Sequence, residues 1–320
     1  MNVGLYFDVR NPSYARRPWP RVYDFALSVC EVADDVGLHS VWVTEHHGFE
    51  DGYMPQPLTF AAAIAARTRR VRIGTALLIA PLRSAAQIAE DAAVVDILSH
   101  GRLELGLGPG YREPEFDLFG ADHAARHRTT ADRVEEIRRL WRDGTVTPPP
   151  VQEEVPIWLG YRRPIGARRA GRLGAGVLAI EPQVETAYRE GLAEAGLPPD
   201  RARMAGPVHG YVTEDPERDW PEVAGHLSYW ADAYRQAMVA PGDPPPKPID
   251  PERWRARGIV AGLGGFAFGT PEEVAAAIRA YVGRAPVETV FFEAVLGGMP
   301  EELVLRQVHA LARLGELLRG

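Results

Sequence analysis

The chain has 320 residues, of which 46% are hydrophobic and 25% are charged, as in ordinary globular proteins. Its formal net charge of −7 argues against nucleic acid as a main partner, because phosphate binding needs a basic surface. The single cysteine, Cys30, excludes an intrachain disulfide and a cysteine-rich metal site. No apolar run approaches the roughly 20 residues that span a bilayer, so we expect a cytoplasmic protein without membrane contact.

Short β-rich runs alternate with longer helical patterns along nearly the whole chain. The predicted strands are Val3–Phe7, Ser40–Thr44, Val71–Thr75, Arg102–Leu107, Ile157–Leu159, Gly176–Ile180, Arg203–Val212 and Glu288–Ala294. The predicted helices lie near Arg21–Val36, Pro57–Thr68, Ser84–Ser99, Ala125–Arg142, Gly166–Leu173, Val184–Ala195, Pro216–Val239, Pro271–Val282 and Glu301–Leu318. Eight strands that are each followed by a helix predict an α/β fold, the (β/α)8 TIM barrel. An open doubly wound sheet is the alternative, but its G-x-G-x-x-G pattern does not follow the first strand.

The sequence also predicts where two helices begin and where the strand–helix alternation is interrupted. Ser84 and Thr270 are in position to cap helices, and Thr270-Pro271-Glu272-Glu273 has the form of a capping box. The stretch 241–250, PGDPPPKPID, is too rich in proline for a helix and too short for a domain. We therefore interpret residues 1–320 as one barrel domain with an insertion, at about 239–265, between the seventh and eighth strands. We expect this insertion to act as a lid.

Ionisable residues follow the second predicted strand in the sequence WVTEHHG, which contains Glu45, His46 and His47. Active sites of (β/α)8 barrels lie at the carboxyl ends of the strands, where these residues fall. Adjacent residues of a strand point to opposite sides, so the two histidines are poorly placed to share a metal ion, and we predict no metal site. Glu45 and His46 are candidate catalytic groups. For His47, a purely structural role and a functional role are equally supported.

Two glycine-containing stretches follow later strands. Gly106, Gly108 and Gly110 come at alternate positions after the fourth strand, where glycine allows a ligand to approach the backbone closely. A tight turn alone would explain one or two of them. Gly160-Tyr161-Arg162-Arg163 opens a helix after the fifth strand, and free N–H groups with two guanidinium groups predict an anion site. Solvated surface charge is the alternative for the arginines.

At these residues the sequence resembles the bacterial luciferase-like superfamily of flavin- and deazaflavin-dependent oxidoreductases. The resemblance extends over nearly the whole chain. The motifs occur in the same order as in the family, and this ordered series is more specific than any one motif. It is carried by WVTEHH (42–47), VRIGTALL (71–78), APL (80–82), QIAEDAAVVDILSHGR (87–102), LGLGPGYREPEFDLFG (105–120), PIWLG (156–160) and GTPEEV (269–274). The EHH at the second strand is similar to the luciferase alpha-subunit branch.

The resemblance implies a flavin across the carboxyl face of the barrel. It implies that His46 is the catalytic histidine beside the flavin, with Glu45 as the strand-two acid. Ala76-Leu77 matches a cis peptide bond that backs the isoalloxazine ring, and Gly108 matches a flavin-proximal cysteine. The stretch 160–163 matches the loop that binds the flavin phosphate. Pro109 replaces a phosphate-contacting arginine, and a serine expected after strand five is missing. The anion contacts are therefore expected from Arg162 and Arg163, or from Arg126 and Arg128.

The activity that the resemblance implies is a two-component monooxygenase. Reduced FMN from a separate flavin reductase would react with O2 and form a C4a-peroxyflavin, which oxygenates a small organic substrate. The alternative on the same scaffold is hydride transfer by coenzyme F420, and a second alternative is a flavin-binding barrel without turnover. The family also implies a homodimer.

Overall fold

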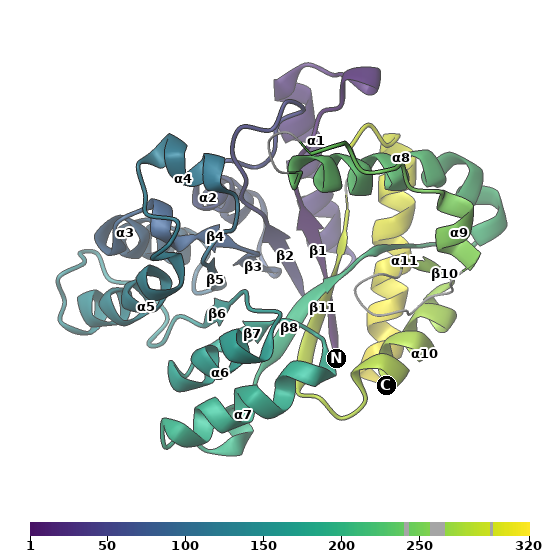
Figure 1. Cartoon of the computed structure of the whole chain (residues 1–320). Helices are drawn as coiled ribbons and strands as arrows, with labels where there is room; N and C mark the ends of the chain where they lie inside the picture. Colours follow the sequence, from purple (N-terminus) through teal and green to yellow (C-terminus); the bar gives the residue numbers. More distant parts are fainter. Residues whose placement is uncertain (240–242, 257–265, 295–296) are drawn as a thin grey trace.

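The computed structural model describes residues 1–239, 243–256, 266–294 and 297–320. Its parallel strands close into an eight-stranded barrel surrounded by helices, which confirms the predicted fold (Figure 1). The barrel strands are β1 (Asn2–Phe7), β2 (Ser40–Val43), β3 (Arg72–Thr75) with β4 (Leu78–Ile79), β5 (Leu103–Gly108), β6 (Ile157–Leu159), β7 (Gly176–Leu178), β8 (Met204–Val208) and β11 (Val287–Glu293). β3 and β4 share one barrel position, because both pair with β5 on either side of Ala76 and Leu77.

The helices that cover the barrel begin close to the predicted positions, except that residues 113–119 form a helix that was not predicted. They are α1 (Trp19–Asp35), α2 (Pro57–Arg67), α3 (Ala85–Leu98), α4 (Glu113–Phe119), α5 (Arg126–Arg142), α6 (Pro164–Arg172), α7 (Glu185–Glu194), α10 (Pro271–Val282) and α11 (Glu301–Arg319). The Ser84 side chain accepts a hydrogen bond from Gln87 N, and Thr270 and Glu273 form the predicted capping box. Both predicted caps are confirmed. Each satisfies amide groups that a helix start leaves without an intrahelical partner.

The barrel interior is filled by large aromatic side chains opposite glycines. Trp42 of β2 stacks on Phe291 of β11 at 4.9 Å between ring centroids and meets Trp158 of β6 edge-on at 6.2 Å. A Cβ at Gly74 would lie 2.1 Å from the Trp42 ring, and one at Gly176 would lie 2.3 Å from the Trp158 ring. The small residues of β3 and β7 therefore create the space that the two indoles fill.

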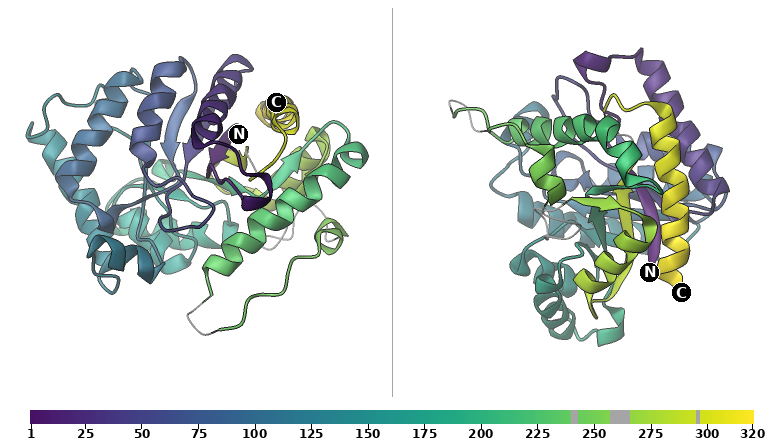
Figure 2. Two further views of the ribbon diagram at one scale, coloured as in Figure 1. Left: turned by 90° about the horizontal axis from the view of Figure 1, so that it is seen from above. Right: turned by 90° about the vertical axis from the view of Figure 1, so that its right-hand side faces the viewer.

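The chain leaves the barrel between β8 and β11, which is a larger excursion than the sequence predicts. The single predicted strand 203–212 is two strands, because His209 separates β8 from β9 (Gly210–Val212). β9 pairs in parallel with β10 (Ala267–Gly269), a strand that the sequence analysis did not predict. Helix α8 (Pro216–Ala237) and helix α9 (Pro251–Ala256) lie between them on the same side of the molecule (Figure 2). Within the expected insertion 239–265, residues 240–242 and 257–265 lie outside the described residues.

Candidate active site

A cavity of about 770 Å3 opens at the carboxyl ends of the barrel strands. This is the face on which barrel enzymes place their active sites, and its size is in the range of small-molecule and cofactor sites. Helix α8 contributes Trp230, Ala231 and Tyr234 to the wall, so the excursion covers one side of the cavity. Among the predicted site residues, Glu45, His46, Ala76, Leu77, Gly110, Gly160, Tyr161, Arg162 and Arg163 line it.

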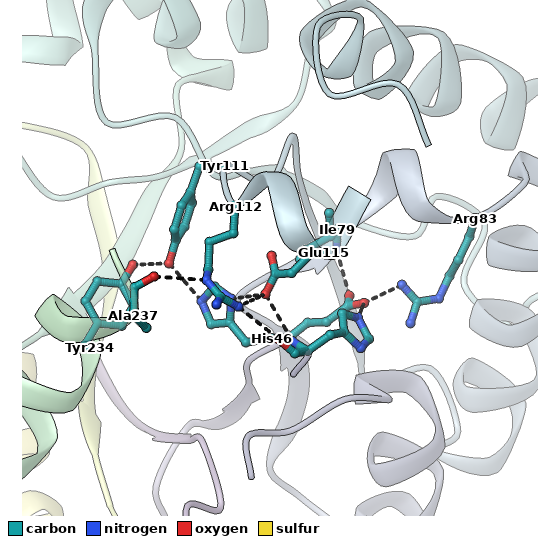
Figure 3. Close-up of polar contacts among 10 residues, drawn as sticks. His46, Ile79, Arg83, Tyr111, Arg112, Glu115, Tyr234 and Ala237 are labelled. Atoms are coloured by element: carbon teal, nitrogen blue, oxygen red, sulfur yellow. Dashed lines mark hydrogen bonds and ion pairs between the residues drawn. The ribbon is translucent and has the colours of Figure 1, made fainter. Parts of the chain in front are cut away.

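His46 is held by a carboxylate that the sequence analysis did not predict. Its Nδ1 lies 2.8 Å from Oε1 of Glu115, in the first turn of α4 (Figure 3). The same oxygen accepts a hydrogen bond from the backbone N–H of His47 at 3.0 Å and one from Nη1 of Arg112 at 3.1 Å. Burial raises the pKa of Glu115, but the contacts with His46, the His47 amide and Arg112 outweigh it and leave the pKa below its usual value. Glu115 is therefore ionised at neutral pH.

The other ring nitrogen of His46 faces two phenols. Nε2 lies 3.0 Å from the hydroxyl of Tyr111, which follows β5, and the Tyr111 hydroxyl also hydrogen bonds to that of Tyr234 on α8. Burial is the main cause that raises the pKa of both tyrosines, so both stay protonated. Arg112, next to Tyr111, donates from Nε to the carbonyl oxygen of Ala237 at 3.3 Å. These contacts connect His46 and Glu115 to the carboxyl end of α8 (Figure 3).

Glu45 has different partners from those that its position beside His46 suggests. One oxygen accepts hydrogen bonds from Arg83 Nη1 at 2.6 Å and contacts His47 Nε2 at 2.7 Å. The other accepts the backbone N–H of Ile79 at 2.7 Å. The carboxylate that contacts the His46 ring is therefore Glu115, whereas Glu45 contacts His47, Arg83 and the Ile79 amide. A carboxylate in the first turn of a helix is common, so the sequence offers no signal that singles out Glu115.

Three glycines after the strands leave space for neighbouring groups, which are the Leu77 side chain and the Thr75 carbonyl. Gly108 and Gly160 make room for Leu77, because a Cβ at either would lie 2.4 or 2.1 Å from Cδ2 of that leucine. A Cβ at Gly106 would lie 1.8 Å from the carbonyl oxygen of Thr75. Gly106 and Gly108 therefore pack behind the wall, and neither is among the residues that line the cavity. The peptide bond between Ala76 and Leu77 is cis, as the resemblance implied.

One end of the cavity is rich in basic side chains. Arg126, His127, Tyr161, Arg162, Arg163 and Arg169 line it. Within the described ranges, Nε of Arg126, Nδ1 of His127 and the hydroxyl of Tyr161 are buried and have no hydrogen-bond partner. Buried polar groups without partners are rare, so these three atoms are available to hydrogen bond to a ligand in the cavity. The first amides of α6 add to this end, since a helix start leaves its N–H groups free. Arg162 is partly compensated by Glu181 at 3.1 Å.

The sequence analysis found only part of this anion site. Arg126, Arg162 and Arg163 were predicted, but Arg128 is exposed and is not among the lining residues. His127 and Arg169 were not predicted. Histidine and arginine are frequent on the solvent side of helices, and only the packing of α5 against α6 brings these two to the cavity.

Two further carboxyl groups lie buried beside the cavity. Asp8 follows β1, and Glu293 ends β11, directly opposite Tyr6 in the sheet register. Burial raises the pKa of Asp8 to about 7 despite the opposing charge of Arg10, and it raises the pKa of Glu293 well above its usual value. Arg10 is already bound to Asp51 at 2.8 Å. One guanidinium cannot balance three carboxylates, so this region holds protonated acid at neutral pH.

Comparison with known proteins assigns the family. The sequence model of the luciferase-like monooxygenases matches residues 1–287. The chain belongs to this family. The monooxygenase RslO1 from Streptomyces bottropensis superposes with a TM-score of 0.80 at 26% identity, over 98% of both chains.

Relatives in the family use two kinds of cofactor. The oxygenase component of flavin-dependent trigonelline monooxygenase from Acinetobacter baylyi is 30% identical over 45% of this chain and 44% of that protein. An F420-dependent glucose-6-phosphate dehydrogenase from Kineococcus radiotolerans is 29% identical over 85% of this chain and 86% of that protein. The chain spans about half the length of this trigonelline monooxygenase component and of two further matches, at 44%, 58% and 55%. The family is one of oxidoreductases and monooxygenases.

The described parts of the chain contain neither a metal-binding cluster nor a membrane-spanning helix. No three His, Cys, Asp or Glu side chains there lie in position to hold a metal ion. No helix in those parts is both long and apolar enough to cross a membrane.

The buried acid predicts an unusual pH dependence of stability. Because the pKa of Asp8 is raised on folding, the free energy of unfolding falls as pH rises from about 4 to about 7. Asp8→Asn removes this loss, so the variant should be more stable than wild type at neutral pH. A shift of about three units corresponds to at most roughly 4 kcal/mol. Near pH 4 the two proteins should be about equally stable.

Urea denaturation at both pH values measures this difference, with exposed Asp117→Asn as the control. An Asp8→Asn variant that is less stable than wild type at neutral pH would contradict the proposed protonation of this acid.

Proposed function

We propose that the protein is a monooxygenase that uses reduced FMN and O2 to oxygenate a small organic substrate. The observation that carries the proposal is the cavity itself, which joins an anion site at one end to the His46–Glu115 pair at the other. When bound, reduced FMN supplies the electrons that activate O2. The family relation to flavin-dependent monooxygenases supports this choice.

The anion end fits the flavin phosphate. Arg126 Nε, His127 Nδ1 and the Tyr161 hydroxyl would each gain a partner there, and Arg162, Arg163 and Arg169 would balance the charge. Hydrogen bonds from charged donors to phosphate are stronger than neutral ones and position the group firmly. The residues present therefore fit FMN, although Pro109 occupies the place of an arginine expected from the family.

The ring end would exclude water and control protons. Leu77 and Ile79 give this part of the wall an apolar surface, which slows unproductive loss of activated oxygen to solvent. His46 presents Nε2 toward the cavity, while Glu115 fixes its orientation through Nδ1. We further propose that the reduced flavin comes from a separate reductase and that the protein works as a homodimer.

An F420-dependent hydride-transfer enzyme is the second candidate. The relative from Kineococcus radiotolerans supports it, because that match covers more of the chain than the monooxygenase match does. Both cofactors carry phosphate, so the anion end alone does not separate them.

Rapid mixing tests the proposal directly. The protein is mixed with reduced FMN without oxygen and then with O2, while near-ultraviolet absorbance is followed. We expect a transient absorbance that lasts at least about tenfold longer than with free reduced FMN, because the cavity excludes water. No retention of reduced FMN, together with tight binding of F420, would overturn the proposal in favour of the second candidate.

The phosphate contacts are tested by comparing FMN with riboflavin, which lacks the phosphate. Arg126→Gln should weaken FMN binding about ten- to a hundredfold, as expected for one charged hydrogen bond, and leave riboflavin binding unchanged. Arg128→Gln is the matched control, because Arg128 lies on the same helix but away from the cavity. Binding is measured by fluorescence titration. Equal losses for both ligands would show that Arg126 does not contact the phosphate.

A further inference from the structure

The donor and the acceptor of each hydrogen bond in the chain at His46 can be assigned. Glu115 is ionised and lies 2.8 Å from Nδ1, so in the neutral imidazole the ring proton is on Nδ1. Nε2 then carries a lone pair and accepts the hydrogen bond of the Tyr111 hydroxyl at 3.0 Å. Because Tyr111 uses its one proton in this way, the Tyr234 hydroxyl donates to the oxygen of Tyr111.

This chain ends in the cavity with a vacant acceptor. Tyr234 lines the cavity, and its oxygen, having donated its own proton, can still accept one from a ligand. The order of donors therefore leads from the cavity through Tyr234 and Tyr111 to Nε2 of His46, with Glu115 behind it. The reverse order would place the unprotonated Nδ1 against a carboxylate. The arrangement is thus that of a base that removes a proton from a bound group.

Groups of both charges lie near Tyr234. Burial raises the pKa of Tyr234 and the negative charge of Glu115 adds to this rise, while the hydrogen bond with Tyr111 and the positive charges of Arg162 and Arg112 oppose it. Arg162 also lies on the cavity wall. Arg162 and Arg112 therefore supply positive charge near a substrate oxygen beside Tyr234, which offsets part of the cost of its ionised form.

The walls beside this chain are aromatic. Tyr53 packs edge-on against His46 at 4.7 Å between ring centroids, and Tyr6 packs on Phe291 at 5.8 Å. Both tyrosines have raised pKa values through burial, and each lines the cavity together with Trp230. These rings offer flat surfaces for offset or edge-on contact with another ring.

We propose that the substrate is a hydroxyarene, which the His46–Glu115 pair deprotonates through Tyr111 and Tyr234. This inference rests on the proposed function, because it names the substrate class of the same site. The substrate O–H bond breaks and its electron pair stays on oxygen. Three protons each move one position along the chain, so that an N–H bond forms at Nε2 of His46. The products are a phenolate and an imidazolium that faces the Glu115 carboxylate, and no atom is oxidised or reduced.

Deprotonation suits one kind of oxygen transfer. A phenolate is rich in electrons at its ortho and para carbons, which makes those carbons nucleophilic toward an electrophilic oxygen. A ketone substrate has no such acidic O–H, and it would instead need a proton donor at its carbonyl oxygen. The direction of the chain at His46 therefore favours ring hydroxylation over oxygen insertion beside a carbonyl.

The test uses 7-hydroxycoumarin, whose neutral and ionised forms absorb at different wavelengths, and the full chain without flavin. We expect the bound probe to ionise at a pH at least one unit below that of the free probe. This corresponds to about a tenfold gain in the ratio of ionised to neutral probe. The methyl ether, 7-methoxycoumarin, should bind about tenfold more weakly because it has no proton to donate.

Substitutions show whether His46, Glu115 and Tyr111 act as a base on the probe or only pack beside it. His46→Gln and Glu115→Gln should each abolish the shift in the probe's ionisation, and Tyr111→Phe should do so by interrupting the chain. Glu113→Gln is the matched control, since Glu113 lies in the same first turn of α4 but is exposed. It should retain the full shift. Thermal denaturation of each variant identifies any that fails to fold, and the remaining two still decide the question.

Three results would overturn the inference: no binding of 7-hydroxycoumarin, binding of its neutral form alone, or an unchanged shift in folded His46→Gln and Glu115→Gln. The outcome is independent of the cofactor. If the probe ionises as expected but reduced FMN does not bind, the substrate class stands and the proposed cofactor is wrong.

Discussion

One buried carboxylate, that of Glu115, organises the chemistry at the end of the barrel. Its Oε1 forms hydrogen bonds with Nδ1 of His46, the backbone N–H of His47 and Nη1 of Arg112, and each nitrogen lies within 3.1 Å of this oxygen. These contacts keep it charged in a buried place, and the charge fixes which nitrogen of His46 is protonated. The tautomer of His46 in turn determines which hydroxyl of Tyr111 and Tyr234 donates the hydrogen bond and which accepts it. Removing the charge would leave the tautomer of His46 undetermined.

The cavity divides its charges between two ends. Arginines line the end where α5 and α6 begin, together with three polar atoms that have no partner among the described residues. Near β1 and β11, in contrast, Asp8 and Glu293 hold protons because burial makes their charged forms costly. The arginine end suits the phosphate of the proposed cofactor, and the proposed hydroxyarene would be ionised beside Tyr234. Helix α8 closes the substrate side, and its contacts with Tyr111 and Arg112 connect this closure to His46.

Much of the frame could be predicted from the sequence, because it depends on local patterns. Alternating strands and helices predicted the barrel, and the sequence WVTEHHG placed His46 at a strand end. Glu115 could not be recognised, since its contact with His46 joins residues 69 positions apart. The division of the predicted strand 203–212 depends on the pairing of β9 with β10, which is equally non-local. The role of Tyr234 could not be predicted either, because its hydroxyl contact with Tyr111 depends on how α8 docks.

The protonation of the His46 ring is the most direct test of this account. Nitrogen-15 NMR of the imidazole, recorded at about pH 8 where histidine is ordinarily neutral, distinguishes the two tautomers. The account predicts a His46 with its proton on Nδ1, which changes to a mixture of tautomers in Glu115→Gln. A His46 with its proton on Nε2 in the wild-type protein would contradict it, because the chain through Tyr111 and Tyr234 could then no longer deliver a proton to the ring.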